Sequence, residues 1–260
     1  MVRMIQNIEI TKKNGEIIHT QYQAPNIEAT KGKTPLIIMV NGFPKSESES
    51  YTLFSALAEK ASLQNCASIR FDFIGNHSSA LHTQDMTIAS MADDLTLVIA
   101  WAHAQGHEKV GFVAEGLGAA VTMIALPDTA RFCAFLWPAF DLQHICNHQF
   151  DVPSKEKDLI EHTFINHDGL LIGADMIKEL QTFDLIPHLE KSHCPTLLLH
   201  GRNDTVISPE NIEIARKHLM SPRLDISMFD DGEHKLDQPN HRKTCISTIM
   251  QFTNHYAMRD

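Results

Sequence analysis

The segment VGFVAEGLGAAV, Val110 to Val121, is the most informative part of this sequence. Its first half is a short apolar run, typical of a strand that is buried on both faces of a sheet. Its second half opens a run of small and apolar residues that predicts a buried helix over 117–126. Gly116 stands between the two, and glycine adopts a positive φ without steric cost. The segment therefore predicts a strand, a sharp turn at Gly116 and a helix.

The same alternation of strand and helix extends to both sides of this segment. The apolar runs that predict strands cover 34–40, 66–73, 109–114, 131–138, 195–201 and 223–230. The segments with helical spacing cover 51–63, 88–102, 117–126, 209–220 and 239–256. Two alternating segments joined around Asn14-Gly15 also predict an N-terminal hairpin. An α/β fold is therefore expected, with about eight mostly parallel strands and helices on both faces of the sheet.

Between Pro138 and Cys194 this alternation stops. The intervening residues are rich in His, Asp and Lys, with helical patterns near 155–165 and 174–180. We interpret 139–192 as a helical lid, or cap, that is inserted into a core domain formed by 1–138 and 193–260.

Composition and charge restrict the kind of partner and compartment. The 260 residues are 43% hydrophobic and 21% charged, as in a globular protein. The formal charge of −10 argues against nucleic acid and anionic membrane surfaces, since both would repel the chain. The N-terminal residues lack the apolar run of a signal peptide, and the five cysteines are scattered. A cytoplasmic protein with reduced thiols is expected, without a prediction of oligomeric state.

Polar residues cluster where the predicted strands end, which is where ligands bind to an open parallel sheet. These residues are Asn41, Asp72, Glu115, Asp204 and His234. The order of a tight turn, an acid and a histidine is that of nucleophile, acid and base in hydrolases with a Gly-x-Ser-x-Gly turn. The five positions of that pattern are 114–118, with Gly116 in place of the serine.

Several segments together carry a resemblance to a known family. They are NGFPKSES (41–48), RFDFIGNHSS (70–79), MTIASMADDLTLVIAWA (86–102), LLLHGRNDTVIS (197–208) and GEHKL (232–236). Through them nearly the whole chain resembles the α/β-hydrolase superfamily, and within it the lid-bearing feruloyl esterase-like and serine aminopeptidase-like members. The chain departs from that pattern at Asn41, Asn76, His77, Glu115 and Gly116. The last two stand where the family has a histidine and the serine.

The resemblance implies the α/β-hydrolase fold and hydrolysis of an ester, or less often a thioester or amide, through an acyl-enzyme. In that scheme His234 is the base, Asp204 orients it, and the backbone N–H groups of Phe43 and Leu117 form the oxyanion hole. Gly116 occupies the nucleophile position. The residues assigned to substrate binding are Asn41, Glu115 and Trp137. No metal or organic cofactor is required, and the expected partner is a small ester or acyl ligand.

Plainer interpretations accompany each of these assignments. Gly116 could be a structural glycine, and Asp204 could only cap a surface turn. Glu115 could line the rim of the pocket or pair with a neighbouring histidine, and a role as general base is its less favoured alternative. His144 and His148 have the i, i+4 spacing of a metal pair on a helix, but without a third ligand they indicate a solvated or packing pair.

Three functions remain open. The first is an esterase that lacks its nucleophile, through natural loss or through engineering. The second is a natural pseudoenzyme that binds a small acyl or aromatic ligand under the lid. In the third, the Asp204–His234 dyad activates water directly.

Overall fold

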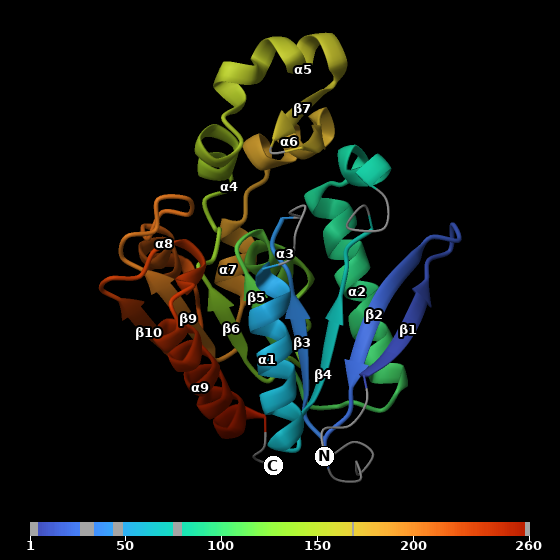
Figure 1. Ribbon diagram of the computed structural model, residues 1–260, viewed down its shortest axis with the longest axis vertical. Helices are drawn as coiled ribbons and strands as arrows, with labels where there is room; N and C mark the ends of the chain where they lie inside the picture. Colours follow the sequence, from blue (N-terminus) through green and yellow to red (C-terminus); the bar gives the residue numbers. More distant parts are fainter. Residues whose placement is uncertain (1–4, 27–33, 44–48, 75–79, 168, 258–260) are drawn as a thin grey trace.

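An eight-stranded sheet lies at the centre of the structure, a computed structural model that describes residues 5–26, 34–43, 49–74, 80–167 and 169–257 (Figure 1). The strand order is β1-β2-β4-β3-β5-β6-β9-β10. The first three strands in this order pair antiparallel, and all the other pairs are parallel. This arrangement confirms the predicted α/β class and the mostly parallel sheet.

The strands follow the apolar runs of the sequence closely. Their bounds are β1 (Ile5–Thr11), β2 (Ile17–Gln23), β3 (Leu36–Val40), β4 (Ala67–Phe71), β5 (Val110–Glu115), β6 (Cys133–Leu136), β9 (Thr196–Gly201) and β10 (Leu224–Phe229). Every residue of β3, β4, β5, β6 and β9 is buried. Such strands need helices on both faces of the sheet, since neither face can remain in water. At the predicted hairpin, Gly15 has φ +90° between β1 and β2.

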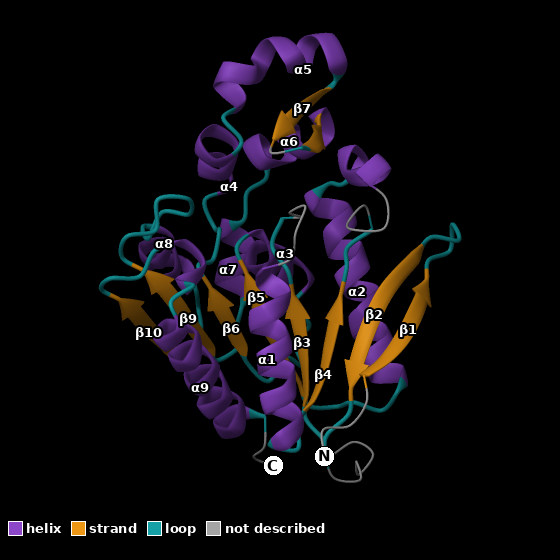
Figure 2. Cartoon of the chain, viewed as in Figure 1, coloured by secondary structure: helices purple, strands orange, loops and turns teal. Residues whose placement is uncertain are grey.

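Helices cover both faces of the sheet (Figures 1 and 2). The helices of the core are α1 (Glu49–Leu63), α2 (Ile88–Ala104), α3 (Leu117–Ala125), α7 (Ile186–Lys191), α8 (Asn211–His218) and α9 (Pro239–Tyr256). One layer consists of α1 and α9, and the other of α2, α3, α7 and α8. The carboxyl ends of the parallel strands are thereby left at one edge between the layers.

Residues 139–192 form short elements, most of which lie above the carboxyl ends of the strands (Figure 1). They are α4 (Leu142–His144), a π-helical turn (Ile145–Gln149), a 3-10 turn (Val152–Lys155), α5 (Glu156–His162), β7 (Phe164–His167), β8 (Leu170–Gly173), α6 (Ala174–Thr182) and α7. The two expected helical pieces correspond to α5 and α6. The segment also contains an unpredicted hairpin, β7–β8, which is separate from the main sheet, while α7 packs beside the sheet against α3 and α8.

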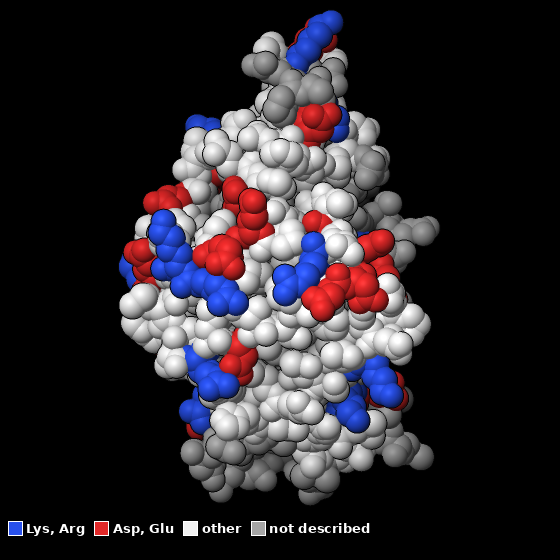
Figure 3. Space-filling model, turned by 90° about the vertical axis from the view of Figure 1, so that its left-hand side faces the viewer, with Lys and Arg blue, Asp and Glu red and all other residues white. Residues whose placement is uncertain are grey.

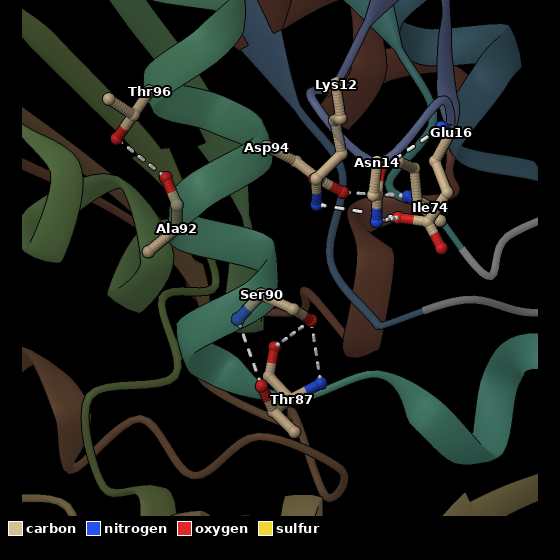
Figure 4. Close-up of polar contacts among 9 residues, drawn as sticks. All are labelled: Lys12, Asn14, Glu16, Ile74, Thr87, Ser90, Ala92, Asp94 and Thr96. Carbon is tan, nitrogen blue, oxygen red and sulfur yellow. Dashed lines mark hydrogen bonds and ion pairs between the residues drawn. The ribbon is translucent and has the colours of Figure 1, made fainter.

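The start of α2 shows how local sequence fixes the residue at which a helix begins. Thr87 Oγ1 accepts a hydrogen bond from Ser90 N at 3.0 Å, and Ser90 Oγ accepts one from Thr87 N at 2.9 Å (Figure 4). This reciprocal capping box satisfies two N–H groups that the first helical turn leaves without partners. It places the first residue of α2 at Ile88, as the spacing predicts.

A buried carboxylate on α2 joins three separate segments of the chain (Figure 4). Lys12 Nζ donates to Asp94 Oδ1 at 2.7 Å, and Ile74 N donates to Asp94 Oδ2 at 2.9 Å. Burial raises the pKa of Asp94, while the hydrogen bonds from Lys12 and Ile74 oppose that rise. Asp94 thus fastens the β1–β2 hairpin and the segment after β4 to α2.

Lys12→Met should therefore destabilise the fold by about 2 kcal/mol at pH 8, because a buried carboxylate would lose its cation. Without Lys12 the pKa of Asp94 rises further. As the pH falls through that raised pKa, Asp94 becomes protonated and no longer needs a cation. The loss of stability caused by Lys12→Met should therefore shrink between pH 8 and the ordinary carboxyl range at about 4. Urea unfolding midpoints at pH 8 and pH 5 measure this. The exposed neighbour in Lys13→Met is the control, and equal losses for the two variants would contradict the prediction.

The surface around β10 and α8 carries both signs of charge. Acidic and basic side chains are interspersed over this face (Figure 3). Two close ion pairs lie on β10 and its neighbouring loops, Arg202 Nε–Asp230 Oδ1 and Arg223 Nε–Asp225 Oδ1, each at 2.6 Å. The net charge of −10 is thus not gathered into one acidic patch here. Among the described residues, no helix combines the length and apolarity that spanning a membrane requires.

Candidate active site

The turn between β5 and α3 has a backbone conformation that side chains rarely adopt. Gly116 has φ 51° and ψ −126°. Its N–H donates to Leu136 O at 3.1 Å, and its carbonyl accepts from Ala119 N at 3.1 Å and Ala139 N at 3.0 Å. These bonds tie the turn to its own helix and to the chain at and beyond β6. Any other residue at position 116 would have to hold a strained backbone.

The space around Gly116 nevertheless accommodates a side chain. A Cβ atom built there would lie 3.4 Å from Ile207 Cδ1 and 3.9 Å from both Gly42 Cα and Trp137 Cδ1. These are ordinary van der Waals contacts. By contrast, a Cβ atom at Gly118 would lie 2.3 Å from Asn41 O. Position 118 therefore requires glycine for close approach of α3 to the end of β3, whereas position 116 carries only a conformational requirement.

Asp204 and His234 meet at the carboxyl end of the sheet. His234 Nδ1 lies 3.0 Å from Asp204 Oδ2 and 3.1 Å from Oδ1. Asp204 Oδ1 also accepts hydrogen bonds from Val206 N at 2.9 Å and Ile207 N at 2.8 Å. Asp204 thus caps the turn after β9 and contacts the histidine with the same carboxylate.

The surroundings of Asp204 keep it ionised. Burial alone would raise its pKa, but hydrogen bonds from His200 and His234, the charge of His234 and the N–H of Ile207 together hold the pKa well below the usual carboxyl range. An ionised carboxylate at Nδ1 selects the imidazole tautomer with Nε2 free to take a proton.

Two side chains connect this pair to the turn at Gly116. Ile207, whose N–H binds Asp204, is the residue nearest to a Cβ atom at position 116. The Trp137 ring, also next to Gly116, lies 5.9 Å from the His234 ring in an edge-on arrangement. Trp137 has an unusual φ of 38°, held by donation from its N–H to Leu199 O at 2.7 Å. The turn, the acid and the histidine are therefore neighbours.

The segment after β3 lies against the same turn. A Cβ atom at Gly42 would be 3.2 Å from Glu115 O and 3.7 Å from Leu117 N, so the two backbones nearly touch. Phe43 follows directly, and its ring lies 5.0 Å from that of Phe150 in the 139–192 insertion. This proximity brings Phe43 and Leu117, the two predicted oxyanion donors, to the same end of the sheet.

The remaining assigned residues are placed as follows. Asn41 Nδ2 donates to Phe71 O at 3.2 Å and so joins the ends of β3 and β4. Glu115 is buried, with Oε1 3.5 Å from Gly42 N. Asn76 and His77 lie outside the described residues.

Two further histidine arrangements remain: the His144–His148 pair, which the sequence indicates as a weak metal pair, and His200. The rings of His144 and His148 stack at 4.1 Å, and the described part of the chain holds no cluster of three metal-ligating side chains. Sequence reasoning missed His200, a buried histidine in β9 that contacts Asp204. Its only signal is its position four residues before the acid.

Comparison with known proteins identifies distant relatives of this chain. No family model matches the chain. It is 21% identical to an acyl transferase of Vibrio campbellii, over 91% of this chain and 90% of that protein. It is 23% identical to the mitochondrial palmitoyl-protein thioesterase ABHD10 of Mus musculus, over 87% of this chain and 78% of that protein.

Solved structures are similar over almost the whole chain. Est1E from Butyrivibrio proteoclasticus with bound ferulic acid superposes with a TM-score of 0.84 at 18% identity, covering 97% of this chain and 100% of that one. Mouse ABHD10 gives 0.73 at 19% identity, covering 96% and 99%. The chain therefore has the α/β-hydrolase fold.

Proposed function

We propose that this chain carries an esterase-type hydrolase site for esters or thioesters of carboxylic acids, with Gly116 at the nucleophile position. The observation that carries the proposal is the Asp204–His234 pair beside the strained turn at Gly116. Structural glycines in ordinary turns need no such pair next to them. If Asp204 only capped a surface turn, its carboxylate would not need the contact with His234.

Without a side chain at position 116, the proposed reaction uses water in place of an acyl-enzyme. Nε2 of His234 removes a proton from water while the water oxygen bonds to the carbonyl carbon. The oxyanion accepts hydrogen bonds from the N–H groups of Phe43 and Leu117. When the carbon–oxygen or carbon–sulfur bond breaks, His234 returns the proton to the leaving alcohol or thiol. Asp204 holds the imidazole and stabilises its cation.

The acyl part of the proposed substrate rests on the relatives and on the aromatic surroundings. The names of the similar proteins mention acyl transfer and palmitoyl-protein thioester cleavage, and Est1E binds ferulic acid. In this chain Trp137 lies beside the same turn, and Phe43, which directly follows Gly42 at that turn, packs against Phe150. We infer that a small acyl or aromatic acyl group binds there, with 139–192 as the lid.

A second candidate is binding of the same ligand without turnover. The observation that favours it is Ile207, because its Cδ1 atom lies 3.4 Å from the Cβ position of residue 116 and borders the space where a nucleophile would stand. In that case the Asp204–His234 pair would only orient a bound acyl group.

Turnover of p-nitrophenyl acetate and of a short acyl thioester separates the two candidates. Slow hydrolysis by the unaltered chain is expected, because oxyanion donors and binding retain about 10³–10⁴-fold catalysis over water and the activation of water by His234 adds to it. His234→Gln should lower that rate at least about tenfold by removing the base. The matched control is His241→Gln, which changes a histidine on α9 that is paired with Asp231. A ligand-induced rise in Tm without turnover in any variant would favour binding alone.

A further inference from the structure

His200, in β9, contacts both ends of the loop that carries the acid. Its side chain is fully buried, and Nε2 lies 2.9 Å from Ile207 O and 3.3 Å from Asp204 Oδ2. Neither the catalytic scheme nor the substrate assignment uses this histidine. Among the described residues, His200 and His234 are nevertheless the only two whose side chains contact the Asp204 carboxylate.

The contacts of His200 define its tautomer. A carbonyl oxygen can only accept, so the proton must reside on Nε2 for the contact with Ile207 O to be a hydrogen bond. Nδ1 of His200 is buried and has no hydrogen-bond partner among the described residues. A proton there would be buried without an acceptor, which is unfavourable. His200 therefore donates through Nε2–H to Ile207 O, and the same nitrogen lies 3.3 Å from Asp204 Oδ2.

This donor completes the environment of the carboxylate. Oδ1 receives the N–H groups of Val206 and Ile207 and also lies 3.1 Å from His234 Nδ1, whereas among the described residues Oδ2 contacts only the imidazoles of His200 and His234. Without His200, rotation of the carboxylate about its Cβ–Cγ bond would be opposed at Oδ2 by His234 alone. Ile207 would also lose a partner, and this residue borders Gly116.

We propose that His200 is a positioning residue that fixes the orientation of Asp204, and through it of His234, at the hydrolase site. The inference rests on the proposed function in that it assigns His234 as the base. The contact itself is independent of turnover. His200 touches neither the reacting atoms nor the ligand in this scheme, so it acts only through Asp204 and Ile207.

The matched variants are His200→Phe, which removes the donor but retains a ring, and His200→Gln, which places an N–H near the position of Nε2. In ¹⁵N spectra of the unaltered protein, His200 should be the Nε2–H tautomer. In His200→Phe, the titration midpoint of Asp204, followed by its carboxyl ¹³C shift, should rise by about one pH unit. The hydrogen-bonded Nδ1–H proton of His234 should exchange about tenfold faster. His200→Gln should restore most of both effects.

His241→Phe is the control, since His241 is also a buried histidine paired with a carboxylate, Asp231 on the loop after β10. It should leave Asp204 and His234 unchanged. In a Gly116→Ser background, His200→Phe should lower kcat at least about tenfold with KM within about twofold. Absence of ester turnover in that background would count against the proposed function and leave the NMR comparison to decide on His200.

Two results would overturn the proposal. One is a folded His200→Phe protein with the Asp204 midpoint and the His234 proton unaltered. The other is an Nδ1–H tautomer of His200 in the unaltered protein, because no donor would then face Asp204. The tautomer of His200 is measured on the unaltered protein, so it tests the proposal even if His200→Phe does not fold.

Discussion

Gly116→Ser is expected to raise kcat/KM for p-nitrophenyl acetate by about 10²–10⁴-fold over the unaltered chain. The nearest atom to a Cβ at this position is 3.4 Å away, so an added Cβ atom makes only ordinary van der Waals contacts. His234 and Asp204, the proposed base and its carboxylate partner, are already in contact, and the segments that carry the proposed oxyanion donors already lie against the turn. Because triad members act as a unit, supplying the missing one should restore most of their joint effect. Initial rates at saturating and limiting substrate measure it.

The same change should lower the free energy of unfolding by about 1 kcal/mol or more, since serine must hold φ 51° and ψ −126°. Gly116→Ala is the control: it carries the same backbone strain without a hydroxyl, so it should lose stability and gain no activity. A serine variant that is as stable and as inert as the unaltered protein would show that the turn is not a nucleophile turn. One that is less stable yet inert would favour binding without turnover.

Much of the core could be predicted because its determinants are local. The apolar run 110–114 can only be buried within a sheet, and the helical spacing from Ile88 onwards defines α2. Residues Thr87 and Ser90 mark its start by capping. The order of Gly116, Asp204 and His234 along the chain could be read in the same way. A parallel sheet brings the ends of its strands to one edge, so their meeting there follows from topology.

Other features depend on contacts between distant segments, and no local pattern reports them. The role of Ile207 and Trp137 as links between Gly116 and the dyad arises only when β5, β6 and β9 lie side by side. The sequence around His200 predicts only a strand residue, because its contacts with Asp204 and Ile207 form when the loop after β9 packs against it. The β7–β8 hairpin differs, because it had a local signal: Gly169 takes φ +85° within an Asp-Gly pair. The helical patterns near 155–165 and 174–180 favoured a helical interpretation of 139–192 instead.

Gly118→Ala is expected to destabilise the protein by about 3 kcal/mol or more, although alanine is the better helix former by about 1 kcal/mol. The added Cβ would lie 2.3 Å from Asn41 O and 2.7 Å from Val40 O. Both obstacles are backbone atoms of a buried strand end, so relief requires that α3 move away from β3. Urea unfolding midpoints for this variant and the unaltered protein measure the loss.

Comparing Gly118→Ala with Gly116→Ala separates two different reasons for glycine, one at position 118 and one at position 116. At position 116 the cost is one of conformation, since φ is positive and space is available. At position 118 the residue is helical and the cost is a collision with backbone. Because Asn41 directly precedes Gly42 and Phe43, the collision should also displace Phe43, whose N–H is a proposed oxyanion donor. The double variant of Gly118→Ala with Gly116→Ser should therefore lose at least about tenfold of the activity gained by serine alone. Gly118→Ala with unchanged stability would mean that α3 does not approach β3 as closely as these distances require.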